Sequence, residues 1–510
     1  MISFIVSMIL LVLGYIFYGR FVEKVFGPDN RQTPAVAHPD GVDYIVLPGW
    51  KIFMIQFLNI AGTGPIFGAI MGMQFGPSAY LWIVFGCIFA GAVHDYLSGM
   101  MSLRHNGAGL PKLIGVYLGS KARVAMLIFS FFLLVMVGAV FVYSPAIIMG
   151  RIFGSTLIWI AVIFVYYIIA TLMPIDKIIG RIYPLFAFSL LFMAVALMVC
   201  LFVKWPTLPE VWNGLDNLGA EKWNMKDQIF PALFITIACG AISGFHATQS
   251  PLMARCLKNE KQGRPVFYGA MITEGLVALI WATVSSYFFF ADGWREVVDT
   301  ETLKEFYVQR WQHIPGVTLI EFFNAPEVVS VVCSGWLGVF GGILAMFGVV
   351  AAPITSGDTA LRSARLIVAE AFNVEQKSMS KRLMISIPIF ALSFALLVWQ
   401  MSYPDGFNTI WRYFGWSNQA LSVFTLWTIT VYLEVKKKPY IITLIPAMFM
   451  TMVCTTFLLH SRAMLNMDRG ISCVLAALFT LFLLTSFLVW KTHRSKTKKQ
   501  WKRNHHLSKK

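Results

Sequence analysis

Long apolar runs dominate this chain and restrict it to one class of fold. A helix needs roughly 18 or more apolar residues to cross a bilayer, and thirteen such runs occur in the 510 residues. They lie near 1–18, 50–73, 79–101, 124–149, 155–173, 183–203, 229–248, 266–290, 331–354, 383–400, 409–433, 439–459 and 470–490. Hydrophobic residues make up 57% of the chain and charged residues 13%, which excludes an ordinary soluble protein. The sequence therefore predicts an all-α polytopic membrane protein with about 13 transmembrane helices.

Basic loops alternate along the chain and indicate its orientation. Cytoplasmic loops are enriched in Lys and Arg, and the basic loops here follow the third, seventh, ninth and eleventh runs. The N-terminus is therefore expected outside and the C-terminus in the cytoplasm. The net charge is +16, and residues 491–510 form a basic tail directly after the last run. Anionic lipids, rather than nucleic acid, are the expected partner of this tail.

Two of the apolar runs are interrupted in the same way. The interruptions are Asn59-Ile60-Ala61-Gly62-Thr63-Gly64-Pro65 and Cys239-Gly240-Ala241-Ile242-Ser243-Gly244-Phe245-His246. Gly and Pro free backbone groups that hydrocarbon does not solvate, so such breaks are typical of a transport site. Close helix packing through small residues is the alternative explanation for either break taken alone.

The spacing of the two breaks predicts an inverted repeat. The broken runs are five spans apart and cross the membrane in opposite directions, which is the layout of a 5+5 inverted-repeat core like that of the leucine transporter. We expect the chain to divide into a peripheral first helix and loop (1–49), repeat 1 (50–203), repeat 2 (229–433), two peripheral spans (434–490) and the basic tail (491–510).

The ends of the broken helices are the expected substrate site. Helix termini present amide groups to anions and carbonyl groups to cations, so we expect a small carboxylate-bearing solute. The candidate substrate-binding residues are Ala61, Gly62, Thr63 and Gly64 at the first break and Ser243, Gly244, His246 and Gln249 at the second.

Two titratable residues are candidates for proton coupling. Glu274 lies well inside an apolar run, where a carboxylate is costly unless it meets a cavity, a partner or a proton. His246 titrates near neutral pH and so can bind substrate or pass a proton. A histidine bonded to a backbone carbonyl is the alternative for His246.

Sodium is the other candidate coupling ion. Thr355 and Ser356 end the ninth run in a cluster of oxygen donors, and with the backbone of Ala61 they are candidate ion ligands. The alternative is that both hydroxyls bond the preceding turn of their own helix. Asp358 is expected to pair with Arg362 at helical i,i+4 spacing. The seven cysteines are scattered without a CxxC pair, so no transition-metal site and no cofactor other than H⁺ or Na⁺ is expected.

Other polar clusters have structural explanations first. His94-Asp95-Tyr96 lies towards the inner end of its run, where anchoring at the membrane interface is the default and gating is the alternative. Asn418 and Gln419 either line a cavity or make hydrogen bonds between helices.

These motifs together resemble the carbon starvation protein A (CstA) family over roughly residues 49–419. The resemblance rests on Ala61-Gly62-Thr63-Gly64-Pro65, His94-Asp95-Tyr96, Ile237 to His246, Glu274 and Phe414-Gly415 with Asn418-Gln419. It implies an inner-membrane transporter related to the amino acid–polyamine–organocation superfamily, with peptides or pyruvate as substrates and proton symport in the pyruvate carriers. Residues 247–251 differ from the longer members, which also carry extra C-terminal spans. A particular substrate is therefore not carried over.

Three classes of function remain after the sequence is considered. A secondary transporter that imports a peptide, an amino acid or pyruvate by proton or sodium symport is the leading interpretation. An intramembrane enzyme is the second interpretation, but the chain has neither the second carboxylate that an aspartyl protease needs nor an HExxH string. A transporter-like nutrient sensor would normally carry a signalling domain, and the longest loop, 291–330, is too short for one.

Overall fold

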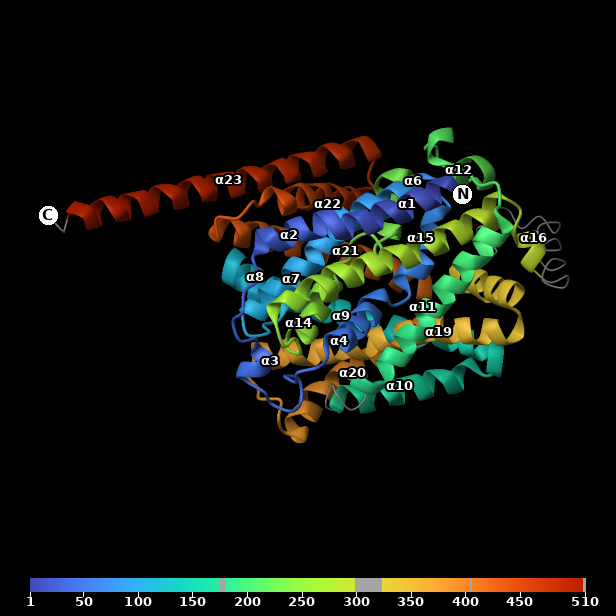
Figure 1. The fold of residues 1–510 in the computed structure, drawn as a ribbon, viewed down its shortest axis with the longest axis horizontal. Helices are drawn as coiled ribbons and strands as arrows, with labels where there is room; N and C mark the ends of the chain where they lie inside the picture. Colours follow the sequence, from blue (N-terminus) through green and yellow to red (C-terminus); the bar gives the residue numbers. More distant parts are fainter. Residues whose placement is uncertain (174–178, 299–322, 404–405, 508–510) are drawn as a thin grey trace.

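A computed structural model describes residues 1–173, 179–298, 323–403 and 406–507. The helices run side by side in one bundle, with the N-terminus at the end that carries α6 and α12 and the C-terminus beyond the opposite end (Figure 1). Parts of the loop 291–330 lie outside the described residues. The described part of the chain is all-helical.

The helices follow the apolar runs closely. In chain order they are α1 Ile2–Leu13, α2 Gly19–Phe26, α3 Pro34–Ala37, α4 Gly49–Ala61, α5 Ala69–Met73, α6 Ser78–Leu81, α7 Ala92–Arg104, α8 Leu110–Leu118, α9 Ser120–Phe153, α10 Thr156–Leu172, α11 Ile179–Lys204, α12 Leu218–Trp223, α13 Phe234–Thr236, α14 His246–Ala254, α15 Gly269–Phe290, α16 Trp294–Val297, α19 Ala325–Ala371, α20 Met379–Ser402, α21 Gly406–Val435, α22 Ile441–His460 and α23 Arg469–Leu507. Wider helical turns join several of them, including η2 Gly64–Gly68, η3 Trp82–Gly91, η5 Ile229–Leu233 and η7 Arg264–Tyr268.

The number of membrane-spanning helices differs from the expected thirteen. Among the described residues, nine helices are long and apolar enough to cross a membrane, or ten when the bent pair Gly49–Ala61 and Gly64–Met73 counts as one span. Of the other three expected spans, α10 has only 17 residues, and α21 carries a polar stretch at 416–419 that lowers its mean hydropathy. The third, 229–248, is unwound between α13 and α14.

Both predicted interruptions break the helix. At the first, Gly62 has φ +48°, a left-handed conformation that favours glycine, and the axis bends by 53° before the chain resumes at Gly64. At the second, residues 237–245 separate α13 from α14, and Gly240 has φ +94°. The two breaks touch, because a Cβ placed on Gly64 would lie 2.3 Å from Sγ of Cys239.

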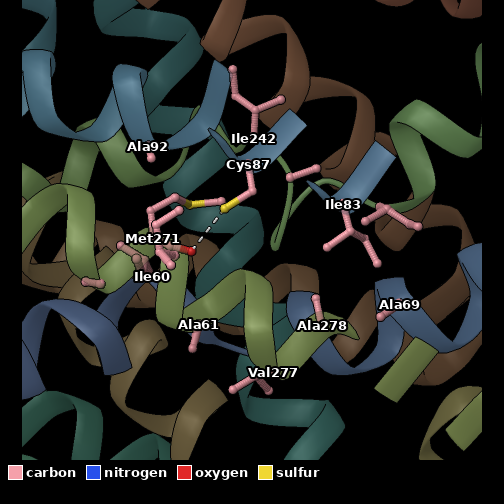
Figure 2. Close-up of a cluster of buried hydrophobic side chains, with 14 of the residues drawn as sticks. Ile60, Ala61, Ala69, Ile83, Cys87, Ala92, Ile242, Met271, Val277 and Ala278 are labelled. Carbon is pink, nitrogen blue, oxygen red and sulfur yellow. Dashed lines mark hydrogen bonds between the residues drawn. The ribbon is translucent and has the colours of Figure 1, made fainter. Parts of the chain in front are cut away.

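Buried apolar side chains of α4, η3 and α15 pack together beside the breaks (Figure 2). Figure 2 shows Ala61 of α4, Cys87 of η3, and Met271 and Ala278 of α15 in one cluster, with the Cys87 thiol donating to the Met271 carbonyl at 3.4 Å. Each of these side chains is fully buried. Small residues let helix backbones approach closely in a membrane, so the polar groups at the breaks are enclosed by protein rather than lipid.

Candidate transport site

A chain of titratable side chains crosses the second break. Asp95 of α7 lies between two histidines, with its Oδ1 2.8 Å from Nδ1 of His94 and its Oδ2 2.8 Å from Nδ1 of His246. His246 is the first residue of α14, and its Nε2 lies 3.6 Å from Oε2 of Glu274 on α15. All four side chains are fully buried. The chain therefore connects three separate segments through groups that can exchange a proton.

The carboxylate oxygens at the Asp95 end of this chain are hydrogen-bonded, whereas those at the Glu274 end have no such bond to a described residue. Asp95 has a histidine on each carboxylate oxygen. Nε2 of His246 and both carboxylate oxygens of Glu274, in contrast, have no hydrogen-bond partner among the described residues. A buried carboxylate is costly unless it is partnered or protonated. Glu274 and His246 are thus placed to gain or lose a proton when the surroundings change.

Asn418 of α21 holds the unwound segment in place. Its Oδ1 accepts hydrogen bonds from the Phe245 amide at 2.7 Å and from the Ser243 hydroxyl at 3.0 Å, and its backbone carbonyl accepts from the Gly244 amide at 3.2 Å. These contacts satisfy backbone groups that the break exposes. The hydrogen-bonding alternative for Asn418 is therefore confirmed.

Further buried polar atoms gather on the segments around the two breaks. Within the described parts of the chain, the side chains of Gln56 and Asn59 on α4 and the hydroxyl of Thr63 have no hydrogen-bond partner. The same holds for Oε1 of Gln249 and Nδ2 of Asn418. Buried polar atoms are nearly always paired, so unpaired donors and acceptors at both breaks are what a polar solute would require.

The two candidate ion ligands on α19 behave differently. The Ser356 hydroxyl reaches the carbonyl oxygens of Leu58 and Asn59 at the end of α4, at 3.1 and 3.0 Å. The Thr355 hydroxyl turns back to the Ala352 carbonyl of its own helix at 2.8 Å, as the alternative expected. Only Ser356 is brought to the first break through its hydroxyl, close to Gly62.

The interfacial interpretation of His94-Asp95-Tyr96 is wrong. His94, Asp95 and Tyr96 are fully buried, and Asp95 belongs to the titratable chain described above. The argument that singled out Glu274, a carboxylate inside an apolar run, applies equally to Asp95 in the run 79–101. That signal was available in the sequence.

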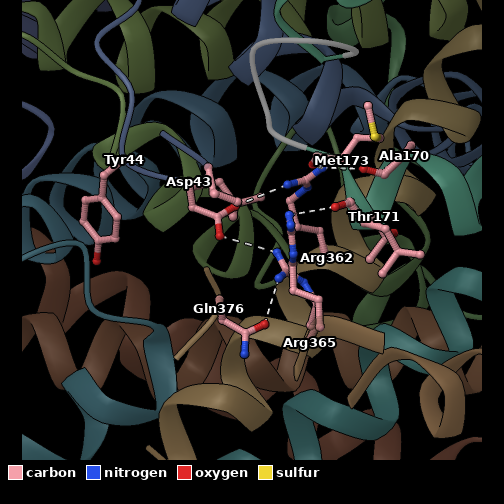
Figure 3. Close-up of polar contacts among 12 residues, drawn as sticks. Asp43, Tyr44, Ala170, Thr171, Met173, Arg362, Arg365 and Gln376 are labelled. Atoms are coloured by element: carbon pink, nitrogen blue, oxygen red, sulfur yellow. Dashed lines mark hydrogen bonds and ion pairs between the residues drawn. The ribbon is translucent and has the colours of Figure 1, made fainter. Parts of the chain in front are cut away.

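A second ionic cluster lies at the end of the bundle that carries α3 and α8. Asp43, in the loop before α4, lies 3.2 Å from Nη1 of Arg362 and 3.4 Å from Nη2 of Arg365 (Figure 3). Arg362 also donates to the Met173 carbonyl at 2.8 Å, and Arg365 donates to Oε1 of Gln376 at 2.8 Å. We call Asp43, Arg362, Arg365 and Gln376 the Asp43 cluster. It ties the loop before the first broken helix to α19.

The Asp43 cluster replaces the ion pair expected within α19. Asp358 accepts from the Tyr183 hydroxyl at 2.7 Å instead, and Arg362 pairs with Asp43. Burial raises the pKa of Asp43, but the guanidinium groups of Arg365 and Arg362 outweigh it and hold the pKa below its usual range. A depressed carboxylate pKa contributes stability that is present above the unfolded value of about 3.9 and is lost as pH falls through the folded value. The cluster therefore stays ionised near neutral pH.

The close approach of the unwound segment to α21 is testable at Gly244. A Cβ at this position would lie 2.3 Å from the backbone carbonyl oxygen of Asn418 and 2.3 Å from the Ser422 nitrogen, and backbone atoms cannot rotate away. We expect Gly244→Ala to lower the free energy of unfolding by about 1–3 kcal/mol, the usual range for overpacking, and to impair uptake. Thermal unfolding in detergent measures the first effect. Gly415→Ala on the same α21 is the control, because its Cβ would meet only Ile235 at 3.9 Å; equal effects of the two variants would contradict the packing.

Comparison with known sequences identifies the family. The profile described as carbon starvation protein CstA matches residues 1–154, 142–304 and 323–457, which together are most of the chain. The chain belongs to the carbon starvation protein CstA family. This is a family of membrane transporters, and the enzyme alternative is thereby set aside.

The relatives include an unassigned protein and named transporters. An uncharacterized membrane protein of Haemophilus influenzae is 46% identical over 57% of this chain and 91% of its own length. The peptide transporter CstA of Bacillus subtilis is 27% identical over 98% of this chain and 97% of its own. The pyruvate/proton symporter BtsT of Escherichia coli is 28% identical over 55% of this chain and 48% of its own.

A solved structure shares the fold. A Na⁺-coupled sialic acid symporter, in a substrate-bound outward-open state, aligns with a TM-score of 0.53 at 12% identity over 94% of this chain and 95% of its own. At this identity the likeness shows the fold of a secondary transporter and nothing about the solute.

Proposed function

We propose that this protein is a secondary transporter that imports a small carboxylate or peptide nutrient, namely a peptide, an amino acid or pyruvate, by proton symport. The observation that carries the proposal is the buried chain from Asp95 through His246 to Glu274, which spans the second helix break. It lies next to the first break, where Gly64 meets Cys239. Binding of a proton and of a solute would thus bias the same movable segments.

The unpaired polar atoms support a carboxylate-bearing solute. Gln56, Asn59 and Thr63 offer donors and acceptors beside the first break, and Gln249 and Asn418 offer them on segments that adjoin the second. The backbone around Ala61, Gly62 and Gly64, with Ser243, Gly244 and His246, is proposed to line the same site. Names of relatives in the family, a peptide transporter and a pyruvate/proton symporter, agree with this class of solute.

The proposed arrangement in the membrane follows from the loops. We propose two inverted five-helix repeats, 50–203 and 229–433, in an inner membrane, with the N-terminus outside and the basic tail in the cytoplasm against anionic lipids. The termini lie at opposite ends of the bundle, in agreement with this topology (Figure 1). The Asp43 cluster would then lie on the cytoplasmic side.

Sodium is the second candidate coupling ion, because the Ser356 hydroxyl meets two carbonyl oxygens of the first broken helix. Ala61, Thr355 and Ser356 would then be its ligands. Oxygen ligands of this kind suit a hard cation. The two candidates are separated by the gradient that drives uptake.

The test is uptake of radiolabelled pyruvate, alanine and dialanine into proteoliposomes under a proton gradient or a sodium gradient. We expect the proton gradient alone to drive accumulation of one of these solutes and a protonophore to abolish it. Ser356→Ala is expected to keep proton-driven accumulation. Accumulation that requires a sodium gradient and is lost in Ser356→Ala would show that sodium, and not the proton, is the coupling ion. If none of the three solutes is taken up under either gradient, the proposed substrate class is overturned.

A further inference from the structure

A thiol completes a set of metal-binding groups at the second break. Sγ of Cys239, Nε2 of His246 and a carboxylate oxygen of Glu274 all lie within 4.8 Å of one another, and the three side chains are buried. The scattered cysteines of the sequence suggested no such site. The tertiary structure brings one of them against a histidine and a glutamate from two segments.

Two of the three side chains present ligand atoms without a hydrogen bond to a described residue, whereas the Cys239 thiol makes one long hydrogen bond, to the Ser243 hydroxyl at 3.7 Å. Nε2 of His246 and both oxygens of Glu274 make no hydrogen bond with any described residue. Nδ1 of His246 lies 2.8 Å from the Asp95 carboxylate, which orients the ring so that Nε2 faces Glu274. A carboxylate behind a histidine in this way is the common second layer of a zinc site.

The chemistry and spacing of the three groups suit a borderline divalent metal. Zn²⁺ binds thiolate, imidazole and carboxylate, and sites with three protein ligands keep a fourth position open. Metal–ligand bonds of about 2.0–2.3 Å place ligand atoms of a tetrahedral site roughly 3.3–3.8 Å apart. Nε2 of His246 is already 3.6 Å from Oε2 of Glu274, within this range, and all three ligand atoms lie within 4.8 Å of one another.

We propose that Cys239, His246 and Glu274 form a binding site for Zn²⁺ that arrests transport. Binding releases the Cys239 thiol proton, and any proton on Nε2 of His246 or on Glu274, to the solvent, because the ligands must be deprotonated. The bound ion cross-links the unwound segment to α15 and occupies the groups that would otherwise take the coupling proton. The arrest rests on the proposed function, whereas the binding site does not.

Cobalt absorption tests the site directly. Tag-free, chelator-treated protein in detergent is titrated with Co²⁺, which substitutes for Zn²⁺. We expect about one equivalent to bind with a thiolate-to-cobalt charge-transfer band and the d–d bands of a tetrahedral ion, and Zn²⁺ to bleach both because it binds more tightly. Absence of these bands in the wild-type protein would overturn the proposal.

Matched variants assign the ligands. Cys239→Ser is expected to lose the charge-transfer band, whereas Cys454→Ser, at a buried thiol of α22, keeps it. Glu274→Gln should keep the band but weaken binding by about tenfold or more. Size-exclusion profiles show whether each variant is folded, and Glu274→Gln carries the test if Cys239→Ser is not. An unchanged spectrum in Cys239→Ser, or unchanged affinity in Glu274→Gln, contradicts the assignment.

A transport assay distinguishes this proposal from the proposed function. Micromolar Zn²⁺ is expected to inhibit uptake by the wild-type protein and to have at least tenfold less effect on Cys239→Ser. Cobalt binding in a protein that transports none of the solutes would overturn the proposed function and leave the metal site standing. Transport that is equally sensitive to Zn²⁺ in both proteins would overturn the arrest.

Discussion

Glu274→Gln is expected to abolish accumulation of the solute while leaving solute exchange in place. Glutamine has nearly the same shape as glutamate but can neither release nor accept the coupling proton. One unit of pH difference is worth about 1.4 kcal/mol per proton, or a tenfold accumulation at equilibrium. A carrier without coupling brings the ratio of solute inside to solute outside to about one. The expected effect of Glu274→Gln is therefore the loss of the entire tenfold accumulation per pH unit. Glu274 is fully buried beside His246, and among the described residues no other carboxylate lies as close to Nε2.

The measurement compares net uptake with exchange in the same proteoliposomes. Net uptake is driven by an imposed proton gradient, and exchange is followed as the release of preloaded labelled solute by unlabelled solute outside. Glu221→Gln, at an exposed position on α12, is the control and should behave like the wild-type protein. Proton-driven accumulation that survives in Glu274→Gln would exclude this carboxylate as the coupling group.

Asp43→Asn is expected to open the end of the bundle that the Asp43 cluster closes. The substitution leaves the guanidinium groups of Arg362 and Arg365 buried without their shared carboxylate. Breaking a buried ion pair from one side costs about 3–5 kcal/mol. The substitution destabilises only the state in which the loop before α4 packs on α19. The population of states in which this loop is released therefore rises. Asp43→Asn should therefore expose side chains that the loop before α4 buries.

Cys256 reports on this opening. It is fully buried beside the loop, and its carbonyl accepts a hydrogen bond from the Leu47 amide at 3.2 Å. Mass spectrometry of maleimide-treated protein should show labelling of Cys256 at least tenfold faster in Asp43→Asn than in the wild-type protein. Asp29→Asn is the control, because its pair with Arg31 is about half exposed and such pairs contribute at most about 1 kcal/mol. Equal labelling rates in all three proteins would show that the cluster does not hold the loop closed.

Local patterns in the chain were sufficient for the class of fold and for half of the titratable chain. The apolar runs predicted an all-helical membrane protein, and the Gly and Pro residues located both helix breaks, because bilayer hydrocarbon tolerates neither charge nor free backbone groups. Glu274 and His246 were found by the same rule, since a titratable residue in an apolar run is exceptional wherever it lies. The family resemblance was likewise carried by these motifs.

The partners of those residues were decided by the packing of distant segments. Asp95 meets His246 across 151 positions, Asn418 meets Ser243 across 175, and Arg362 meets Asp43 across 319. Helical periodicity relates residues three or four apart and says nothing about such pairs. For the same reason the pairing of Asp358 with Arg362 was wrong, and no metal-binding role was predicted for Cys239. The sequence shows which costly groups lie in apolar runs, and only the tertiary structure shows which of them are paired, as Asp95 is, and which keep unpaired atoms, as Glu274 does.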